Sequence, residues 1–256
     1  MSRAPLSKSC CLGPTLWLWP GQALYAGPSL DLGMHAGSVA CLAVGIDDAF
    51  VVETAAGTLR TRSALIEART RHQFVAPGAR MAFSYLDPGS VREEACRRSM
   101  SKLDAGVRHG HEREDELTRL AANLRATRED ANRWRALAAP VTPGHVDPRV
   151  QTAARRLVQD PTEARGAPEF ARDAGLSLSR FLHLFSDQTG TTFRRYRLWA
   201  KMLRAGTVLA AGHDLTTAAV EAGFSSSSHF SSSFHATFGL RPSQLIAAGL
   251  TIVIAT

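Results

Sequence analysis

Residues 222–239 read AGFSSSSHFSSSFHATFG, a run of serines interleaved with phenylalanines. Phe230, Phe234 and Phe238 recur every four residues, a spacing that places their side chains along one face of a helix. Serine is a mediocre helix former, and serine runs are common in flexible linkers. The phenylalanine spacing nevertheless predicts an amphipathic helix whose outer face consists of small hydroxyl side chains.

Residues 169–190 follow the same plan as residues 218–239. Each copy has a short helical pattern that ends in Ala-Gly, then a large apolar residue, a serine, two phenylalanines four residues apart and a closing glycine. We expect the first glycine to take a positive φ, Ser177 and Ser225 to cap the second helices, and the phenylalanines to bury those helices against the first ones. The second copy has one extra residue before its first phenylalanine. This layout predicts two helix-turn-helix units.

A long helix from about residue 192 to residue 211 is expected to connect the two copies. Four basic residues share one narrow face of this helix, namely Arg194, Arg197, Lys201 and Arg204, whereas Arg195 lies off that face. The face is either simply solvated or contacts DNA phosphates. Shorter helices are expected at 150–159, 168–175 and 215–223, and Pro242 is expected to open a last one.

The duplicated pattern, the long connecting helix and the closing FGLRPSQL at 238–245 resemble the DNA-binding domain of AraC/XylS-type transcriptional regulators over residues 149–248. The resemblance implies that both second helices enter successive major grooves on one face of the DNA. DNA contacts are then expected from the side chains that point away from the phenylalanines and from the basic face: Ser177, Ser179, Arg180, Leu182, His183, Ser186, Arg194, Arg197, Lys201, Arg204, Ser225, Ser227, Ser228, Ser231, Ser232 and His235. The alternative is that these residues form solvated faces.

The second copy departs from the family pattern because its outer face carries no arginine. A bidentate contact between arginine and guanine is worth roughly 1–3 kcal/mol of base discrimination. We therefore expect the first unit, with Ser179, Leu182 and His183, to read more of the DNA sequence than the second.

Residues 12–92 contain short apolar runs separated by Pro-Gly and other glycine-containing turns, which predicts an all-β barrel or sandwich. The segment resembles the cupin-like domain that precedes the DNA-binding domain in many members of this family. The expected fold is therefore α+β: an N-terminal degenerate cupin-like β-barrel followed by an all-α bipartite helix-turn-helix domain. His35 and His72 are candidates for an effector pocket. The His-x-His pattern of metal-binding cupins is absent, and we expect no metal ion and no cofactor.

Residues 93–148 are expected to form a helical segment and a linker, with a polar loop or helix start at 104–116. Leu117, Leu120 and Leu124 begin a weak heptad that continues to Ala138. Such a helix either lies on its own domain or pairs with a second copy in a homodimer. Three prolines and a glycine mark 139–148 as the linker.

The chain of 256 residues has a formal net charge of +7 and a pI of about 9.8, which fits a nucleic-acid partner. The apolar stretch near the N-terminus is a poor signal peptide, and no apolar run is long enough for a membrane span, so we expect a cytoplasmic protein. The four cysteines, Cys10, Cys11, Cys41 and Cys96, lack metal-ligand or CxxC spacing and are expected to be reduced. We found no catalytic constellation in the sequence and expect no enzyme.

These patterns predict a sequence-specific DNA-binding transcriptional regulator that a small molecule in the N-terminal barrel modulates, with RNA polymerase as a further candidate partner. The alternative is a regulator whose barrel only dimerises and binds no ligand. The sequence identifies neither the effector nor the operator.

Overall fold

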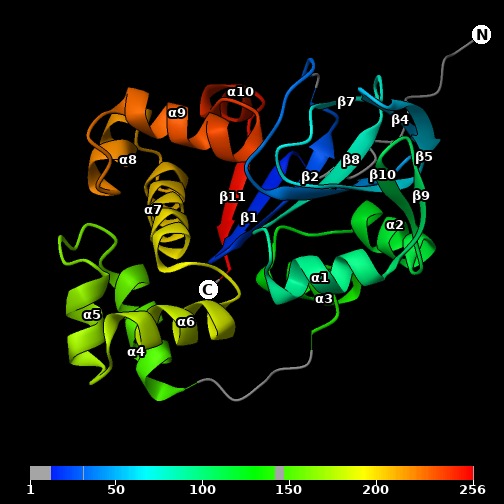
Figure 1. Cartoon of the computed structure of the whole chain (residues 1–256). Helices are drawn as coiled ribbons and strands as arrows, with labels where there is room; N and C mark the ends of the chain where they lie inside the picture. The colour runs from blue at the N-terminus through cyan, green and yellow to red at the C-terminus, as the bar shows by residue number, and fades with distance from the viewer. Residues whose placement is uncertain (1–12, 31, 142–146, 256) are drawn as a thin grey trace, which may run out of the picture.

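The computed structural model describes residues 13–30, 32–141 and 147–255. An eight-stranded sheet has the strand order β11-β1-β2-β8-β3-β6-β10-β9, and a three-stranded sheet has the order β5-β4-β7 (Figure 1). The strands are β1 (Thr15–Trp19), β2 (Gln22–Pro28), β3 (Ala40–Gly45), β4 (Phe50–Thr54), β5 (Gly57–Thr61), β6 (Ser63–Ile66), β7 (His72–Val75), β8 (Arg80–Leu86), β9 (Met100–Asp104), β10 (Val107–His111) and β11 (Thr251–Ile254).

The central strands of the large sheet are buried on both faces. In β1, Leu16 and Leu18 point to one core, and Trp17 and Trp19 point to a second core on the opposite face. This second core is covered by helices α1 (Val91–Arg98), α2 (Glu114–Ala122) and α3 (Arg128–Ala138). Because successive strand residues alternate between faces, a strand between two cores is apolar throughout.

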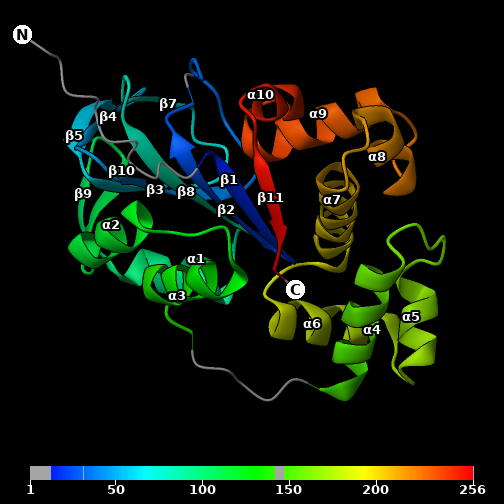
Figure 2. The ribbon, with the colours of Figure 1, turned by 180° about the vertical axis from the view of Figure 1, so that it is seen from behind.

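The described part of the C-terminal region, residues 147–255, has seven helices: α4 (Pro148–Gln159), α5 (Ala167–Asp173), α6 (Leu178–Thr189), α7 (Phe193–Ala210), α8 (Leu215–Glu221), α9 (Ser227–Phe238) and α10 (Pro242–Ala247). Helix α7 stands between the group α4–α6 and the group α8–α10, as the opposite views of Figures 1 and 2 both show. The first group has a core of its own around Phe181 and Phe185, whereas Phe230 and Phe234 belong to the core that also contains β1 and β2 residues.

The apolar end of the chain returns to the N-terminal sheet. Strand β11 pairs in parallel with β1, with Thr251 opposite Thr15 (Figure 2). Helix α7 approaches this edge at Gly206, where an added Cβ would lie 2.5 Å from Leu18 Cδ1 and 3.5 Å from Ile254 Cδ1. Glycine at this position therefore lets the long helix approach β1 and β11 closely without displacing Leu18.

The expectation for residues 93–148 was partly wrong. Strands β9 and β10 lie within 100–111 and belong to the large sheet, so 104–116 contains a strand where a polar loop was expected; the alternative of a helix start holds only for its end, because α2 begins at Glu114. In β10, Val107, His109 and His111 are buried while Arg108 and Gly110 are half-buried. This is the two-residue period of a strand, which the histidines and arginine concealed in the sequence.

The predicted heptad is also interrupted, because α2 ends at Ala122 and α3 begins at Arg128. Leu117 and Leu124 are buried and Leu120 is partly buried, and all three pack against the core under the sheet. Trp134 closes this contact by donating its indole N–H to the carbonyl of Leu117, at 3.0 Å. The leucines therefore lie on their own domain, which contradicts the proposed pairing of two copies through them.

The two described cysteines, Cys41 and Cys96, are free and buried. Burial raises the pKa of Cys96 to about 12, and it raises that of Cys41 further. Neither thiol therefore forms a thiolate near neutral pH. Cys10 and Cys11 lie outside the described residues. Within the described ranges, no helix is long and apolar enough to cross a membrane.

Candidate nucleic-acid interface

The first helix-turn-helix unit, α5 and α6, has the predicted local structure. Gly175 follows α5 with a φ of +64°. The hydroxyl of Ser177 accepts a hydrogen bond from the backbone N–H of Arg180 and caps α6. Phe181 and Phe185 are fully buried, and Gly190 ends α6 in the left-handed conformation. The turn, the cap and the buried row are therefore confirmed for this copy.

The second unit, α8 and α9, differs from the prediction in its cap. The residue that caps α9 is Ser226, whose hydroxyl accepts from the backbone N–H of His229 at 3.1 Å. The hydroxyl of Ser225 instead contacts Nδ1 of His229 at 3.0 Å. The extra residue in this copy moves the start of the helix by one position, so the assignment of the cap to Ser225 was wrong. Phe230, Phe234 and Phe238 are buried as expected.

The predicted DNA-contacting residues of α6 and α9 lie opposite the buried phenylalanines. Ser177, Ser179, Arg180, Leu182 and His183 are exposed and Ser186 is half-buried; Ser225, Ser228, Ser232 and His235 are exposed, and Ser227 and Ser231 are half-buried. Leu178, which we did not single out from the sequence, is 42% exposed one turn before Leu182, itself 37% exposed. Leu178 lies four residues before Leu182 and out of phase with Phe181 and Phe185, so the sequence alone could have placed it on the exposed face.

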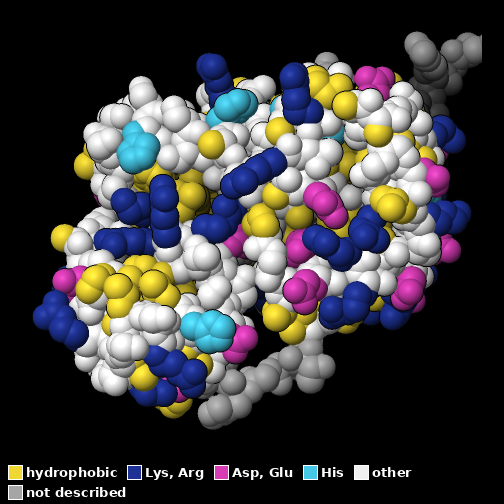
Figure 3. Space-filling model, in the orientation of Figure 1, with side chains coloured by type: hydrophobic (Ala, Val, Ile, Leu, Met, Phe, Trp, Pro, Cys, Tyr) yellow, Lys and Arg dark blue, Asp and Glu magenta, His cyan; other side chains and the backbone are white. Residues whose placement is uncertain are grey.

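The basic residues of α7 make more contacts than a solvated face would. Arg197 donates to the carbonyl of Arg165 at 2.9 Å, and Lys201 Nζ donates to the carbonyl of Gly223 at 2.6 Å. Arg204 forms an ion pair with Glu221 at 2.6 Å. Figure 3 shows lysine and arginine side chains gathered between the two helical groups. Arg194 is exposed, and its side chain forms no hydrogen bond or ion pair with another described residue.

Lys201 also lies over the ring of Phe224, at 5.5 Å from the centroid. Burial, and then the charge of Arg197, lowers the pKa of Lys201. Because Lys201 and Arg204 contact the second unit and Arg197 contacts the loop before α5, these residues fasten both units to α7. The basic face thus has a structural role that its spacing in the sequence did not reveal.

The structure brings the two candidate pocket residues of the N-terminal region together. The ring centroids of His35 and His72 lie 4.5 Å apart, and the two backbones exchange hydrogen bonds of 2.9 and 3.0 Å. Desolvation by burial lowers the pKa of His72 to about 4, so this imidazole is neutral at pH 7. In each ring Nδ1 lies 2.9 Å from a backbone carbonyl, to which it donates; in the neutral imidazole of His72 this leaves Nε2 as an acceptor.

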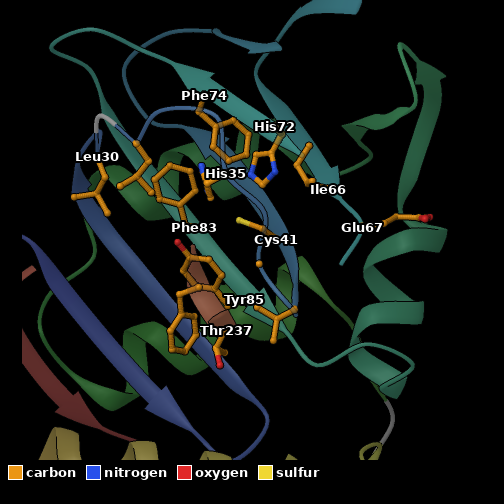
Figure 4. Close-up of a pocket in the computed structure, with 14 residues that line it drawn as sticks. Leu30, His35, Cys41, Ile66, Glu67, His72, Phe74, Phe83, Tyr85 and Thr237 are labelled. Carbon is orange, nitrogen blue, oxygen red and sulfur yellow. The ribbon is translucent and has the colours of Figure 1, made fainter. Parts of the chain in front are cut away.

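Apolar side chains from both sheets surround these histidines (Figure 4). The lining includes Phe74, Phe83 and Tyr85 from the strands and Thr237 and Phe238 from the end of α9. Glu67 points away from the two imidazoles in Figure 4 and pairs with Arg97 and Arg108. Among the described residues, no group of three or more His, Cys, Asp and Glu side chains could hold a metal ion.

Residues 170–248 match the family model of a helix-turn-helix domain. Over 77 residues the chain is 38% identical to the virulence regulon transcriptional activator VirF of Yersinia enterocolitica and to the thermoregulatory protein LcrF of Yersinia pestis. The matched region makes up 30% of this chain and 28% of the length of each of these curated relatives.

The structure of an apo variant of ToxT from Vibrio cholerae is similar over 90% of this chain and 98% of that one, with a TM-score of 0.52 and 9% identity. At this identity the likeness concerns the fold: a β-rich, cupin-like N-terminal region followed by a helical C-terminal region. The expected α+β class is confirmed, with the addition that the last strand, β11, belongs to the N-terminal sheet.

Proposed function

Because the C-terminal part of the chain contains an AraC-type helix-turn-helix domain, we propose that the protein binds double-stranded DNA and regulates transcription. The observation that carries the proposal is the pair of exposed faces on α6 and α9, each backed by a buried row of phenylalanines. A helix held in this way presents only its outer face to a major groove. The proposed site of action is the cytoplasm, with RNA polymerase as a candidate partner.

The two faces are proposed to contribute differently to recognition. Helix α6 offers a guanidinium, an imidazole and the apolar Leu182, which can contact a thymine methyl group. Helix α9 offers mainly serines, whose hydroxyls can bond to either phosphates or bases. We assign base reading chiefly to α6, and positioning on the backbone to α9 and to Arg194 of α7.

The test is a selection of bound duplexes from a random DNA library with the full chain, followed by affinity measurements at several salt concentrations. Arg180→Ala in α6 is expected to weaken binding to the selected duplex. Arg60→Ala in β5 removes the same charge from an exposed strand of the small sheet and is expected to change little. Equal losses for the two variants, or no duplex binding at low salt, would exclude this proposal.

For the N-terminal region we propose an uncharged effector with an apolar body and one hydrogen-bond donor. The lining is largely aromatic and aliphatic, and its polar members include His35, His72 and Thr237, with the neutral imidazole of His72 as a candidate acceptor for the donor of the effector. Glu67, the carboxylate of the lining, is paired with Arg97 and Arg108, so a charged ligand would lose its hydration without a free counter-charge.

The alternative is a barrel that only dimerises and binds no ligand. Thermal unfolding in the presence of a metabolite library separates the two, since a ligand that binds only the folded state raises the melting temperature with concentration. His72→Phe is expected to abolish the shift for a true pocket ligand. A dimer would need a surface other than Leu117, Leu120 and Leu124, which are packed in the core.

A further inference from the structure

Asp87 directly follows β8 and is fully buried, with 0% of its surface exposed. Arg195 of α7 donates to Oδ1 from Nε at 2.6 Å and from a terminal nitrogen at 2.5 Å. The hydroxyl of Thr191 donates to Oδ2, and the indole N–H of Trp199 lies 3.3 Å from Oδ1. All three donors belong to α7 or to the residues just before it, so a carboxylate of the N-terminal region is satisfied entirely by the C-terminal region.

The hydrogen bonds continue from this carboxylate to the other helix-turn-helix unit. Arg195 also donates to the carbonyl of Ser38, at 3.2 Å. The backbone N–H of Ser38 in turn donates to the carbonyls of Ala236 and Thr237, at 3.0 and 3.2 Å, in the last turn of α9. Thr191 directly follows Gly190, the residue that ends α6. One hydrogen-bond network therefore joins the end of α6 to the end of α9 through Asp87 and Ser38.

The closing glycine of each unit lies against an N-terminal segment next to this network. A Cβ on Gly190, after α6, would lie 3.2 Å from Cβ of Ser90, and one on Gly239, after α9, would lie 2.1 Å from Cδ2 of His35. Both glycines have positive φ values, of 72° and 79°. The relative placement of α6 and α9 is therefore held by the N-terminal region as well as by α7.

We propose that Asp87 is a positioning residue for DNA binding: through Arg195 and Ser38 it fixes the separation of α6 and α9, and hence the spacing of the two DNA segments that the chain accepts. Desolvation of the fully buried Asp87 offsets much of its attraction to Arg195, so the pair adds little net stability, but a buried carboxylate keeps its donors in one arrangement. This inference rests on the proposed function, because it assumes that α6 and α9 both contact DNA.

The test uses the full chain and a duplex obtained by selection, in which base pairs are inserted or removed between the two contacted segments. One base pair changes their separation by about 3.4 Å and their relative rotation by roughly 35°. We expect the parent protein to prefer one spacing by about tenfold or more, a ratio typical of losing one good base contact. Asp87→Asn and Arg195→Gln are expected to reduce this preference to about twofold. Arg195→Lys keeps the positive charge but loses the planar pair of N–H donors, so its spacing preference is expected to be intermediate.

Asp47→Asn is the matched control, because it removes one carboxylate from an ion pair with Arg80, at 2.6 Å, within the N-terminal region. It should leave the spacing preference unchanged.

A merely stabilising role for Asp87 would lower the melting temperature without altering the spacing preference, and that result would overturn the inference while leaving the proposed function intact. If Asp87→Asn does not fold, Arg195→Gln decides the matter, since Arg195 lies at the edge of the network and its side chain is 29% exposed. A parent protein that binds no duplex at any spacing would overturn the proposed function and this inference together.

Discussion

Truncating Phe185 to alanine should unfold the first helix-turn-helix unit locally. The ring is fully buried and packs against Phe181, Phe193 and Tyr196, with centroid separations of 5.7, 5.4 and 5.3 Å. Replacing a buried phenylalanine by alanine costs roughly 3–5 kcal/mol, and three aromatic partners place this site toward the upper end. Such a loss is a large part of the 5–15 kcal/mol that typically stabilises a whole domain.

The loss is expected to stay local because the core around Phe185 is separate from the core shared with the sheet. Hydrogen exchange followed by mass spectrometry should show faster exchange in α4–α6 and little change in the strands. Phe234→Ala offers the contrast: this ring contacts Phe230 and Phe238 in the shared core, so its loss should also loosen the contacts with the sheet.

Leu182→Ala is the matched control on the same helix, since its side chain is 37% exposed and surface substitutions usually stay within about 0.5 kcal/mol. The reasoning would be refuted if Phe185→Ala exchanged and melted like the parent protein yet lost DNA binding. In that case the ring would belong to the interface and not to the core.

Three further outcomes are expected. Substituting His183 by alanine should change base preference at one position by roughly 1–3 kcal/mol, whereas Ser232→Ala should weaken binding only slightly; a repeated duplex selection measures both, and the reverse pattern would contradict the division of roles. Arg194→Ala should lower the slope of log affinity against log salt by about 1 relative to the parent, and an unchanged slope in a salt titration would remove Arg194 from the phosphate contacts. Because burial lowers the pKa of His72 to about 4 from its ordinary 6.5, the unfolded chain takes up this proton first, so stability falls as the pH drops from 6.5 towards 4. The part of this loss due to His72 is about 2 kcal/mol between pH 7 and pH 5. Urea denaturation at the two pH values should show it in the parent and not in His72→Gln, and an equal pH dependence in both would reject the assignment.

The sequence by itself determined the local structure of the C-terminal region. Glycines at 175, 190, 223 and 239, phenylalanines four residues apart and the capping Ser177 act within one or two helical turns, so their spacing alone predicts helices, turns and buried faces. Even here the cap of α9 was misplaced by one residue, because four consecutive serines at 225–228 offer equivalent hydroxyls. The choice of Ser226 follows from the phase of the buried phenylalanines.

Only the tertiary structure decided how distant segments combine. Strand β10 carries polar residues whose burial depends on its place between β6 and β9, and the tail became a strand because β1 presented a free edge. The basic residues of α7 proved to be partly engaged within the protein, and Arg195, which lies off their face, found its partner at Asp87, 108 residues earlier in the chain. The physical reason is that helical periodicity and capping are local, whereas the partner of a strand edge or of a buried charge is set by which surfaces the folded chain brings together.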